Sequence, residues 1–349
     1  VEIMDIDLEF INEEILKDRL IAGKINLVGI TTTTPTYNNA LVLAKAVKEI
    51  SNAYVVLGGV HVTVLPIESI THPQVDFVVI GEGEVTIVEL IKALESNDGL
   101  DKIEGLVFKR NGQIVRNKPR QPVNSLDSLP FPERDLFRNN KYTYPDSLCS
   151  RTAPIITSRG CFGKCGYCLT PVISGNHCRY RSAKNVVDEI ENLKEDYKIQ
   201  EIHFWDDNFI GLKSRIFEIR DELRRRNIRL KYAFPNGVRA DFISEDILKT
   251  LKDMGTYSIA IGVESGSQDI LDSANKNIKL SKVIKVFEML KKLKFETWAF
   301  FMFGLPGEDN LTNIANINFA IKIDPDVVKF HILKPYPGTI IFDYLKKRA

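Results

Sequence analysis

The chain has 349 residues, of which 44% are hydrophobic and 27% charged, and its formal net charge is +1. This length exceeds the usual size of one domain, so two domains are expected, and the near-neutral charge gives no support for a nucleic-acid or membrane-surface ligand. No run of eighteen or more uncharged apolar residues occurs, so no transmembrane helix is predicted. The chain opens at Val1 without an initiator methionine or a signal-like segment, and we expect it to be part of a longer polypeptide.

Short apolar segments alternate with helical patterns through the first third of the chain. Strands are predicted at 1–6, 26–31, 54–59 and 76–82, and helices at 11–22, 38–51 and 84–96. The strands are continuously apolar and rich in Val and Ile, which is typical of a parallel sheet with helices on both faces. A hairpin is predicted after them, because Asn111-Gly112 separates two strand-like runs. These patterns predict a doubly wound α/β domain at 1–117.

A second series of strands and helices follows a proline-rich stretch. The stretch lacks periodicity and is predicted to be a linker at 118–150. Strands are then predicted at 154–160, 201–207, 231–238, 257–264, 297–304 and 327–335, with helices at 182–196, 213–226, 244–254, 281–294 and 309–322. Six βα units in series predict a partial (β/α)6 barrel resembling a TIM barrel over 151–349. In such barrels the chemistry takes place at the carboxyl ends of the strands.

Three of the five cysteines lie within eight positions, in the segment CFGKCGYC. Cys161, Cys165 and Cys168 come directly after the first strand of the second half, at the expected mouth of the barrel. Three thiolates on one short loop can ligate three irons of a [4Fe-4S] cubane and leave the fourth iron open to a ligand. Clustered cysteines also indicate a reducing compartment, so we expect a cytoplasmic protein.

Zinc is the competing interpretation of this cysteine triad. Structural zinc usually takes four ligands in two pairs, and no second CxxC pair occurs in the sequence. A fourth ligand would have to come from His177, Cys178 or Cys149. We interpret these three as incidental surface or packing residues and favour the iron–sulfur cluster.

The CxxxCxxC spacing resembles the signature of the radical S-adenosylmethionine (SAM) superfamily. FWDDNF, NGVRAD, VESGSQDILDSANK and FMFGLPGED resemble the segments at the ends of the second to fifth strands of that family, so the resemblance covers the whole second half. It implies that the open iron binds SAM, and that one electron cleaves SAM to a 5′-deoxyadenosyl radical. It also implies contacts to SAM from Tyr167 at the adenine, Glu264 at the ribose, Arg239 at the carboxylate, and the backbone around Gly304 and Gly307 at the adenine.

Each of these side chains also has a structural alternative. Arg239 could belong to a salt bridge, Tyr167 could only pack, and Glu264 and Glu308 could be caps or first-turn charges of helices. Three further polar residues are interpreted as caps of the following helix rather than as substrate ligands: Asp206, Asp207 and Asn208.

The first half resembles the cobalamin (B12)-binding domain found upstream of many radical SAM enzymes, which has a flavodoxin-like fold. VGITTTTPTYNNALVLAKAVKE, YVVLGGVHVTVLP and DFVVIGEGE carry this resemblance. Hydroxyl groups after one strand would bind the nucleotide tail, and glycines at the next strand ends would admit a bulky ligand. The residues implied are Thr31, Thr32, Thr33, Thr34, Gly58, Gly59, Gly81 and Gly83. The alternative is a doubly wound domain that binds another nucleotide or no ligand.

Two parts of the family pattern are missing from this sequence. A first strand and helix would precede Val1, together with the DxHxxG motif that supplies a cobalt ligand in some relatives, and a small helical domain would follow the last residues. His61 is interpreted as a loop residue rather than a cobalt ligand. We expect cobalamin to bind without its own base and without a protein histidine on cobalt.

The two halves together resemble cobalamin-dependent radical SAM enzymes. The resemblance implies a [4Fe-4S] cluster, SAM and cobalamin as cofactors, and methyl transfer to an unactivated carbon of a small-molecule substrate. Cyclisation or rearrangement is the alternative with the same cofactors, and a non-catalytic cobalamin- or redox-sensing protein is the alternative of another class. A methylthiotransferase is rejected, because it needs three further cysteines upstream and residues 1–148 have none. The implied partner is an electron donor such as flavodoxin or ferredoxin, and no nucleic-acid partner is indicated.

Overall fold

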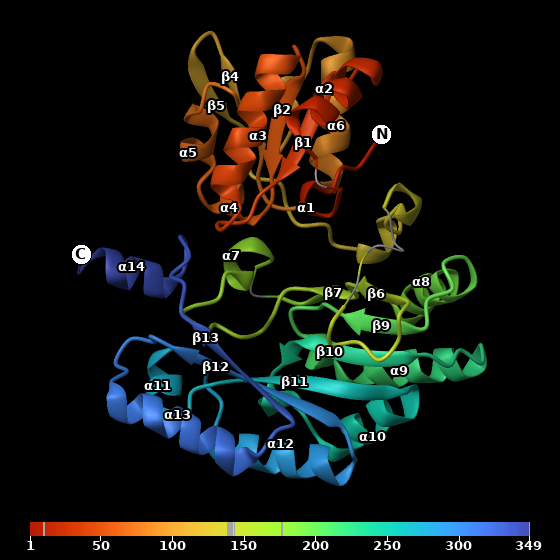
Figure 1. Cartoon of the computed structure of the whole chain (residues 1–349), viewed down its shortest axis with the longest axis vertical. Coiled ribbons are helices and arrows are strands. Elements are labelled where there is room, and N and C mark those ends of the chain that lie inside the picture. The colour runs from red at the N-terminus through yellow and green to blue at the C-terminus, as the bar shows by residue number, and fades with distance from the viewer. Residues whose placement is uncertain (10, 138–141, 143, 176, 349) are drawn as a thin grey trace. The chain divides into compact units, whose positions relative to one another are not determined.

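The computed structural model describes residues 1–9, 11–137, 142, 144–175 and 177–348 (Figure 1). The chain divides into two compact units. Unit 1 is Val1–Asn124 with Glu133–Phe137, and unit 2 is Ser125–Pro132 with Arg138–Ala349. Positions 138–141 and 143 of the predicted linker lie outside the described residues. Within the described ranges, none of the helices has the length and apolar character needed to cross a bilayer.

Unit 1 contains one five-stranded sheet in the order β1-β2-β3-β4-β5. Its strands are β1 (Leu27–Thr31), β2 (Tyr54–Gly58), β3 (Phe77–Val79), β4 (Leu106–Arg110) and β5 (Gln113–Arg116). The first three are parallel, and the β4–β5 hairpin continues the sheet in antiparallel pairing. Asn111 and Gly112 both have positive φ, 51° and 76°, as the predicted type I′ turn requires. The hairpin therefore extends the parallel sheet that the sequence predicts.

Helices cover both faces of this sheet. They are α1 (Ile6–Glu9), α2 (Glu13–Ala22), α3 (Tyr37–Ile50), α4 (Val60–Val64), α5 (Pro66–Thr71) and α6 (Glu84–Ser96), with a 3-10 turn η1 (Leu100–Lys102). Val55 and Leu57 of β2 pack in the core formed with α2 to α5, whereas Val56 packs in the core formed with α6. This alternation confirms the doubly wound α/β prediction.

The strand predicted at 1–6 is wrong. Residues 1–5 have no regular structure, and Ile6 begins α1. The Asp5 carboxylate accepts the backbone N–H of Leu8 at 3.1 Å, which is the contact of a helix N-cap. Local capping therefore outweighs the apolar character that suggested a strand.

Unit 2 contains an open, wholly parallel six-stranded sheet in the order β6-β9-β10-β11-β12-β13. Its strands are β6 (Thr152–Ile155), β9 (Glu201–Phe204), β10 (Lys231–Val238), β11 (Thr256–Glu264), β12 (Glu296–Phe303) and β13 (Val327–Ile332). A short antiparallel ribbon of β7 (Ser158–Arg159) and β8 (Arg179–Tyr180) lies beyond β6. The predicted partial (β/α)6 barrel is thereby confirmed, and the described strands leave it open.

The helices of unit 2 follow its strands. They are α7 (Thr170–Ile173), α8 (Ala183–Glu195), α9 (Lys213–Arg225), α10 (Glu245–Met254), α11 (Gln268–Ser273), α12 (Leu280–Lys292), α13 (Asn310–Ile323) and α14 (Ile340–Lys346). Unit 2 also contains the 3-10 turns η2 (Leu126–Ser128), η5 (Phe209–Gly211) and η6 (Ala240–Phe242), and the turn η3 (Arg134–Leu136) belongs to unit 1. Ala299 and Phe301 of β12 are buried in the core shared with these helices, whereas Trp298 and Phe300 are only partly buried. Alternate residues of the strand thus serve opposite faces of the sheet.

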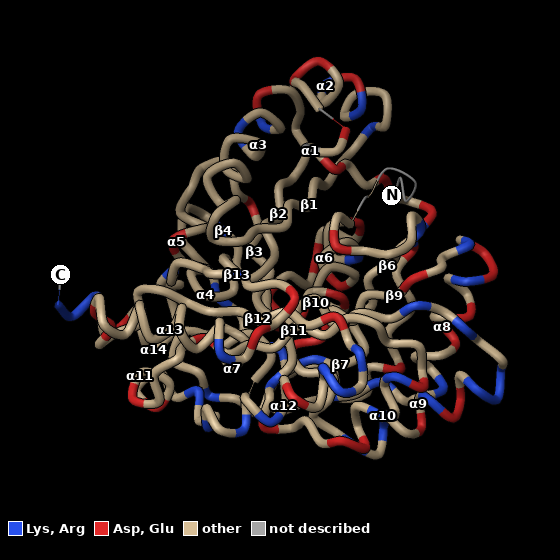
Figure 2. Tube along the Cα trace, turned by 60° about the horizontal axis from the view of Figure 1, so that its bottom comes forward, with Lys and Arg blue, Asp and Glu red and all other residues tan. Residues whose placement is uncertain are grey.

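Charged residues of both signs are interspersed along the outer helices of unit 2 (Figure 2). Arg226, at the end of α9, shows how they pair. Its guanidinium binds the carboxylates of Asp188, Glu191 and Glu222, each at 2.7 Å. Arg226 therefore links α9 to α8 through three ion pairs.

Candidate functional site

The cysteine loop begins at a glycine that no other residue can replace without strain. Gly160 directly follows β7 and has φ +94°, and a Cβ built on it would lie 2.2 Å from the carbonyl oxygen of His177. The thiol of Cys178 donates to the Gly160 carbonyl at 3.3 Å. Close approach of the chain after β7 to the chain before β8 therefore holds the two ends of the ribbon together.

Each of the three predicted ligand cysteines has an N–H donor directed at its sulfur. Gly163 N lies 3.3 Å from Cys161 Sγ, Thr170 N lies 3.5 Å from Cys168 Sγ, and Arg239 Nη1 lies 3.4 Å from Cys165 Sγ. Burial raises the pKa of the Cys161 and Cys168 thiols, and these donors oppose that effect. Donors to sulfur are what surrounds thiolate ligands in metal sites. The chemistry of the loop therefore fits an iron–sulfur cluster, although no three His, Cys, Asp or Glu side chains of the described residues already converge as a metal site.

Asp207 joins the two ends of the cysteine loop. Its Oδ2 accepts the backbone N–H of Gly160 at 2.8 Å, and its Oδ1 accepts the hydroxyl of Thr170 at 3.2 Å. That same hydroxyl lies 3.4 Å from Cys168 Sγ. A single carboxylate at the end of β9 thus fixes the residue before the first cysteine and the residue two after the last.

The helix-cap interpretation is wrong for Asp206 and Asp207, whereas Asn208 occupies the N-cap position of η5 without a capping side-chain bond. α9 begins only after Leu212, and no side chain of the three caps η5 or α9. Asp206 is fully buried and instead accepts the N–H of Thr157 at 3.1 Å and its hydroxyl at 2.8 Å. Because the end of β9 lies beside β6, donors that follow the neighbouring strand bind Asp206 Oδ1 before any helix begins, whereas Oδ2 has no hydrogen-bond partner among the described residues.

Arg239 follows β10, and its guanidinium makes a two-point hydrogen bond with the carboxylate of Asp241. Nε and Nη2 donate to the two carboxylate oxygens at 3.1 and 3.0 Å, and Nη2 also donates to the carbonyl of Lys276 at 2.9 Å. The salt-bridge alternative for Arg239 is therefore confirmed. Its predicted contact with the SAM carboxylate stays a prediction.

A buried ion pair lies beside the cysteine loop. Glu264, the last residue of β11, has φ +70°, and its Oε1 lies 3.0 Å from the Nζ of Lys276. Their side chains are only 13% and 7% exposed. A Cβ on Gly262 would lie 2.7 Å from Glu264 Oε1 and 3.1 Å from Lys276 Nζ, so this glycine makes room for the pair. Burial lowers the pKa of Lys276, but Glu264 and Cys165 outweigh it and raise the pKa overall.

Sequence reasoning missed Lys276. A lysine in the polar segment after α11 has the pattern of a solvated residue, and the only available signal was its place within the VESGSQDILDSANK segment. The helix-cap alternative for Glu264 is wrong, because its charge is used on this lysine.

Tyr167 belongs to the cysteine loop and packs against a small apolar core. Its ring contacts a small core of Ile270, Ala274, Leu305 and Ile341. The hydroxyl is buried and has no hydrogen-bond partner among the described residues. Burial, followed by the charges of Glu264 and Cys165, raises the pKa of Tyr167 well above its ordinary value. The packing alternative is therefore confirmed for its ring, and its predicted adenine contact stays a prediction.

Glu308 connects two loops at the carboxyl ends of β11 and β12. Its Oε2 accepts the N–H groups of Gly304 and Leu305 at 2.6 and 3.0 Å, and its Oε1 accepts Asn316 Nδ2 at 3.2 Å. Buried Asn316 in turn accepts the N–H of Gly266 at 2.6 Å through Oδ1. The helix-cap alternative for Glu308 is wrong, because Asp309 caps α13 through a capping box with Thr312.

The glycines predicted to approach SAM are exposed and have left-handed backbones. Gly304 has φ +91° and Gly307 has φ +93°. Pro306 lies between them, and the turn they form follows β12 directly. The structure thus brings Gly304, Gly307 and the Glu308 network to the same edge of the sheet as the cysteine loop.

In unit 1 the predicted ligand residues gather at the carboxyl ends of β1, β2 and β3. The N–H and hydroxyl of Thr32 both lie 2.8 Å from the Gly58 carbonyl. Gly59 has φ +98°, and a Cβ on it would lie 2.5 Å from the Thr32 carbonyl. Thr63, between these strand ends, donates to the Gly59 carbonyl and accepts the N–H of Gly81 at 3.0 Å. These contacts hold the three strand ends together.

The remaining predicted residues of unit 1 differ in how far they are available to a ligand. Thr31 and Thr33 are exposed, whereas Thr34 lies 3.2 Å from His61 Nδ1. A Cβ on Gly58 or Gly81 would meet nothing within 4 Å, so open space lies above both; Gly83, before α6, is closer to Val79. These open positions are where a bulky ligand has room.

His61 is a buried helix residue rather than the loop residue that the sequence suggested. It lies on α4, is 6% exposed, and contacts the Tyr37 ring at a tilt of 31°, with ring centroids 3.9 Å apart. Burial lowers the pKa of His61. Val62, the next residue of this short helix, is buried in the same core, and the histidine is buried beside it.

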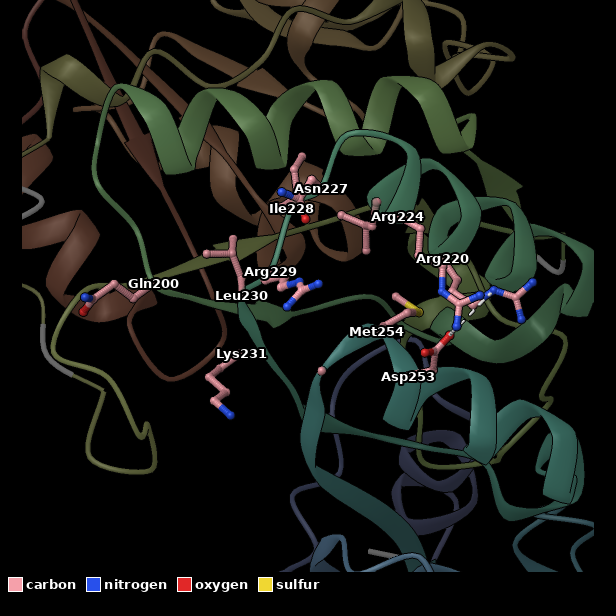
Figure 3. A pocket seen from close by; sticks show the side chains of 12 residues that line it. Gln200, Arg220, Arg224, Asn227, Ile228, Arg229, Leu230, Lys231, Asp253 and Met254 are labelled. Atoms are coloured by element: carbon pink, nitrogen blue, oxygen red, sulfur yellow. Dashed lines mark ion pairs between the residues drawn. The ribbon is translucent and has the colours of Figure 1, made fainter.

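A surface cavity lies at the opposite end of the unit 2 sheet from the cysteine loop. This cavity of about 810 Å³ opens at the amino ends of β10 and β11, where Arg220 and Arg224 are directed at Asp253 (Figure 3). Cys149 lies at this same end, because its N–H binds Glu201, the first residue of β9. The structure therefore separates Cys149 from the triad, while it brings Cys178 beside Gly160.

Known proteins match both halves of the chain. Residues 155–314 match the radical SAM superfamily, and residues 1–91 match the B12 binding domain. The chain is 35% identical over 321 residues to an uncharacterized methyltransferase, PH0819, of Pyrococcus horikoshii, across 91% of this chain and 69% of the relative. It is 27% identical over 353 residues to the anaerobic magnesium-protoporphyrin IX monomethyl ester cyclase of Cereibacter sphaeroides, across 99% of this chain and 57% of the relative.

A solved structure shares the fold. The radical S-adenosylmethionine methyltransferase TsrM of Kitasatospora setae, with its tryptophan substrate and a SAM analog bound, aligns with a TM-score of 0.83 at 19% identity. The alignment covers 99% of this chain and 70% of TsrM. This chain therefore spans between 57% and 70% of the length of the three proteins.

Proposed function

The chain belongs to the cobalamin (B12)-dependent radical SAM enzymes, and from this premise we propose that it methylates an unactivated carbon of a small-molecule substrate. The observation that carries the proposal is the 35% identity, across 91% of the chain, to a protein named as an uncharacterized methyltransferase. The proposal keeps the predicted division into a cobalamin-binding domain at 1–117, a linker at 118–150 and a radical SAM domain at 151–349. It also places the enzyme in the cytoplasm, with an electron donor such as flavodoxin or ferredoxin.

The three thiolates of Cys161, Cys165 and Cys168 hold the cluster in this proposal. When the cofactors are bound, the cluster supplies the electron that cleaves SAM, and cobalamin carries the methyl group. Asp207 keeps the loop closed around its ligands through Gly160 and Thr170.

Glu264 and the glycines after β12 orient SAM. Lys276 holds one carboxylate oxygen of Glu264, and the other oxygen, Oε2, has no hydrogen-bond partner among the described residues. That oxygen is available to accept a hydroxyl group of the ribose. The exposed backbone around Gly304 and Gly307 allows the adenine to approach closely.

Cyclisation is the second candidate, supported by the cyclase that aligns with 99% of this chain. The product balance distinguishes the two reactions. Methylation consumes two molecules of SAM and yields S-adenosylhomocysteine together with 5′-deoxyadenosine, whereas cyclisation yields 5′-deoxyadenosine alone.

The test is anaerobic reconstitution with iron, sulfide and hydroxocobalamin, followed by reduction and addition of SAM labelled at its methyl group with deuterium. A metabolite extract of the host serves as the substrate source, and products are identified by mass spectrometry. We expect a product heavier by one labelled methyl group, with S-adenosylhomocysteine in equal amount. The matched control is Cys165→Ala, which should form neither product. Label-free products with 5′-deoxyadenosine alone would favour the cyclase reaction.

A further inference from the structure

We propose that Arg239 is a positioning residue of the iron–sulfur cluster, acting through Cys165, and does not bind the SAM carboxylate. This inference rests on the proposed function, because it requires the cysteine triad to hold a cluster. It departs from the role that the family resemblance implies for Arg239.

The guanidinium has no free edge for a second carboxylate. Two-point binding of a carboxylate needs two parallel N–H groups, either from Nε and Nη2 or from Nη1 and Nη2. Asp241 occupies the Nε–Nη2 edge, at 3.1 and 3.0 Å. The second N–H of Nη2 is used on the carbonyl of Lys276 at 2.9 Å. Both edges share Nη2, so neither can bind SAM in this way while these contacts persist.

The remaining nitrogen of Arg239 is directed into the cysteine loop. Nη1 lies 3.4 Å from Cys165 Sγ, and the side chain is only 12% exposed. A Cβ built on Gly163, midway between Cys161 and Cys165, would lie 2.7 Å from Nη1 and 3.5 Å from Cζ. The guanidinium therefore fills space that only a glycine leaves in this loop. It is held there from the side opposite the sulfur by Asp241 and Lys276.

A charged N–H donor to a ligand sulfur has a defined electrochemical effect. Reduction adds an electron to the cluster, so the donor binds the reduced form more strongly and raises its reduction potential. A charged hydrogen bond corresponds to roughly a tenfold change in an equilibrium constant. For a one-electron couple, a tenfold change is about 59 mV.

The experiment compares the midpoint potential and the SAM affinity of the reconstituted chain with those of three variants. Arg239→Lys keeps the charge but loses the two-point hydrogen bond, and Gly163→Ala keeps every charge but displaces the guanidinium. Arg229→Lys is the matched control, because Arg229 is exposed at the amino end of β10. Potentials are measured by redox titration with electron paramagnetic resonance, and SAM affinity by the change of that spectrum on addition of SAM.

We expect Arg239→Lys and Gly163→Ala to lower the reduction equilibrium constant about tenfold, equivalent to about 59 mV, and to change SAM affinity less than threefold. Arg229→Lys should change neither quantity. An unchanged potential with SAM affinity lowered tenfold or more would overturn the inference and return Arg239 to the SAM carboxylate.

Loss of the cluster in a variant is also decisive. If Arg239→Lys and Gly163→Ala fail to retain iron while the thermal unfolding of the cluster-free chain is unchanged, Arg239 acts on the cluster loop as inferred. If the cluster-free chain itself unfolds at a much lower temperature, Arg239 is only a structural residue and the inference fails. Failure of the unsubstituted chain to assemble a cluster would instead count against the proposed function.

Discussion

The loops at the carboxyl ends of the two sheets are held together by different kinds of interaction. In unit 1, hydroxyl groups, glycines and backbone carbonyls hold the strand ends together, and positions such as Thr31 and Gly58 remain open. In unit 2, partly buried ion pairs hold the loops in place, namely Glu264–Lys276 and Arg239–Asp241. The difference teaches that a neutral loop can leave room for a large ligand without charged side chains. Ion pairs, by contrast, fix the side chains of a reactive site before its ligands bind.

Among the variants considered, substitution of Lys276 should lower the free energy of unfolding most. Lys276→Met leaves the Glu264 carboxylate buried without its partner, and removing one member of a buried pair costs about 3–5 kcal/mol. The free energy of unfolding of the cluster-free chain, measured with denaturant, should fall by that amount. The double variant Glu264→Gln with Lys276→Met should recover most of it. Equal stability of the single and double variants would show that unit 2 does not depend on the pair.

Substitution of two adjacent glycines in unit 1 should affect different properties, stability at Gly59 and ligand binding at Gly58. Gly59→Ala places a Cβ 2.5 Å from the Thr32 carbonyl at φ +98°, so we expect a loss of about 1–3 kcal/mol in the free energy of unfolding. Gly58→Ala meets nothing within 4 Å and should change stability by less than about 0.5 kcal/mol.

Cobalamin uptake distinguishes the two glycine variants further. Gly58→Ala should fold normally and still retain less cobalamin, measured by the visible absorption of the reconstituted protein after desalting. Unchanged uptake in Gly58→Ala would show that the open space above β2 is not used by the ligand.

The smallest effect is expected at the threonines after β1. Thr31→Val removes an exposed hydroxyl and should leave stability within about 0.5 kcal/mol, while lost hydrogen bonding to cobalamin should weaken its binding about fivefold. Thr32→Val removes the buried bond to the Gly58 carbonyl and should cost about 0.5–1.5 kcal/mol. Titration of cobalamin and denaturant unfolding measure the two quantities. The opposite ranking would mean that Thr32 is the ligand residue.

Much of the fold could be predicted because it depends on local patterns. Apolar strands such as β2, the turn at Asn111 and the helix beginning after Ser182 follow from continuous apolar runs, turn propensity and capping. The strand at 1–6 failed because a single Asp5 contact decided the local conformation. Periodicity does not register such a contact.

Only the part of the candidate site that lies within a sequence motif could be predicted. The spacing of the cysteines marked the loop, but the partners of Asp207 and Arg239 lie 47 and 74 residues away in the chain. Lys276 was missed because burial, which turns an ordinary lysine into the partner of Glu264, is set by the packing of β11 and the following segment. Pairings of this kind arise from tertiary structure.

The hydrogen bonds of Asn316 have a consequence for motion in unit 2. One amide side chain links the turn after β12, through Glu308, to the turn after β11, through Gly266. Neither turn can shift far without straining the same buried amide. Displacement of one turn by a ligand should therefore be transmitted to the other, so that the two open and close as one mechanical element rather than as independent flaps.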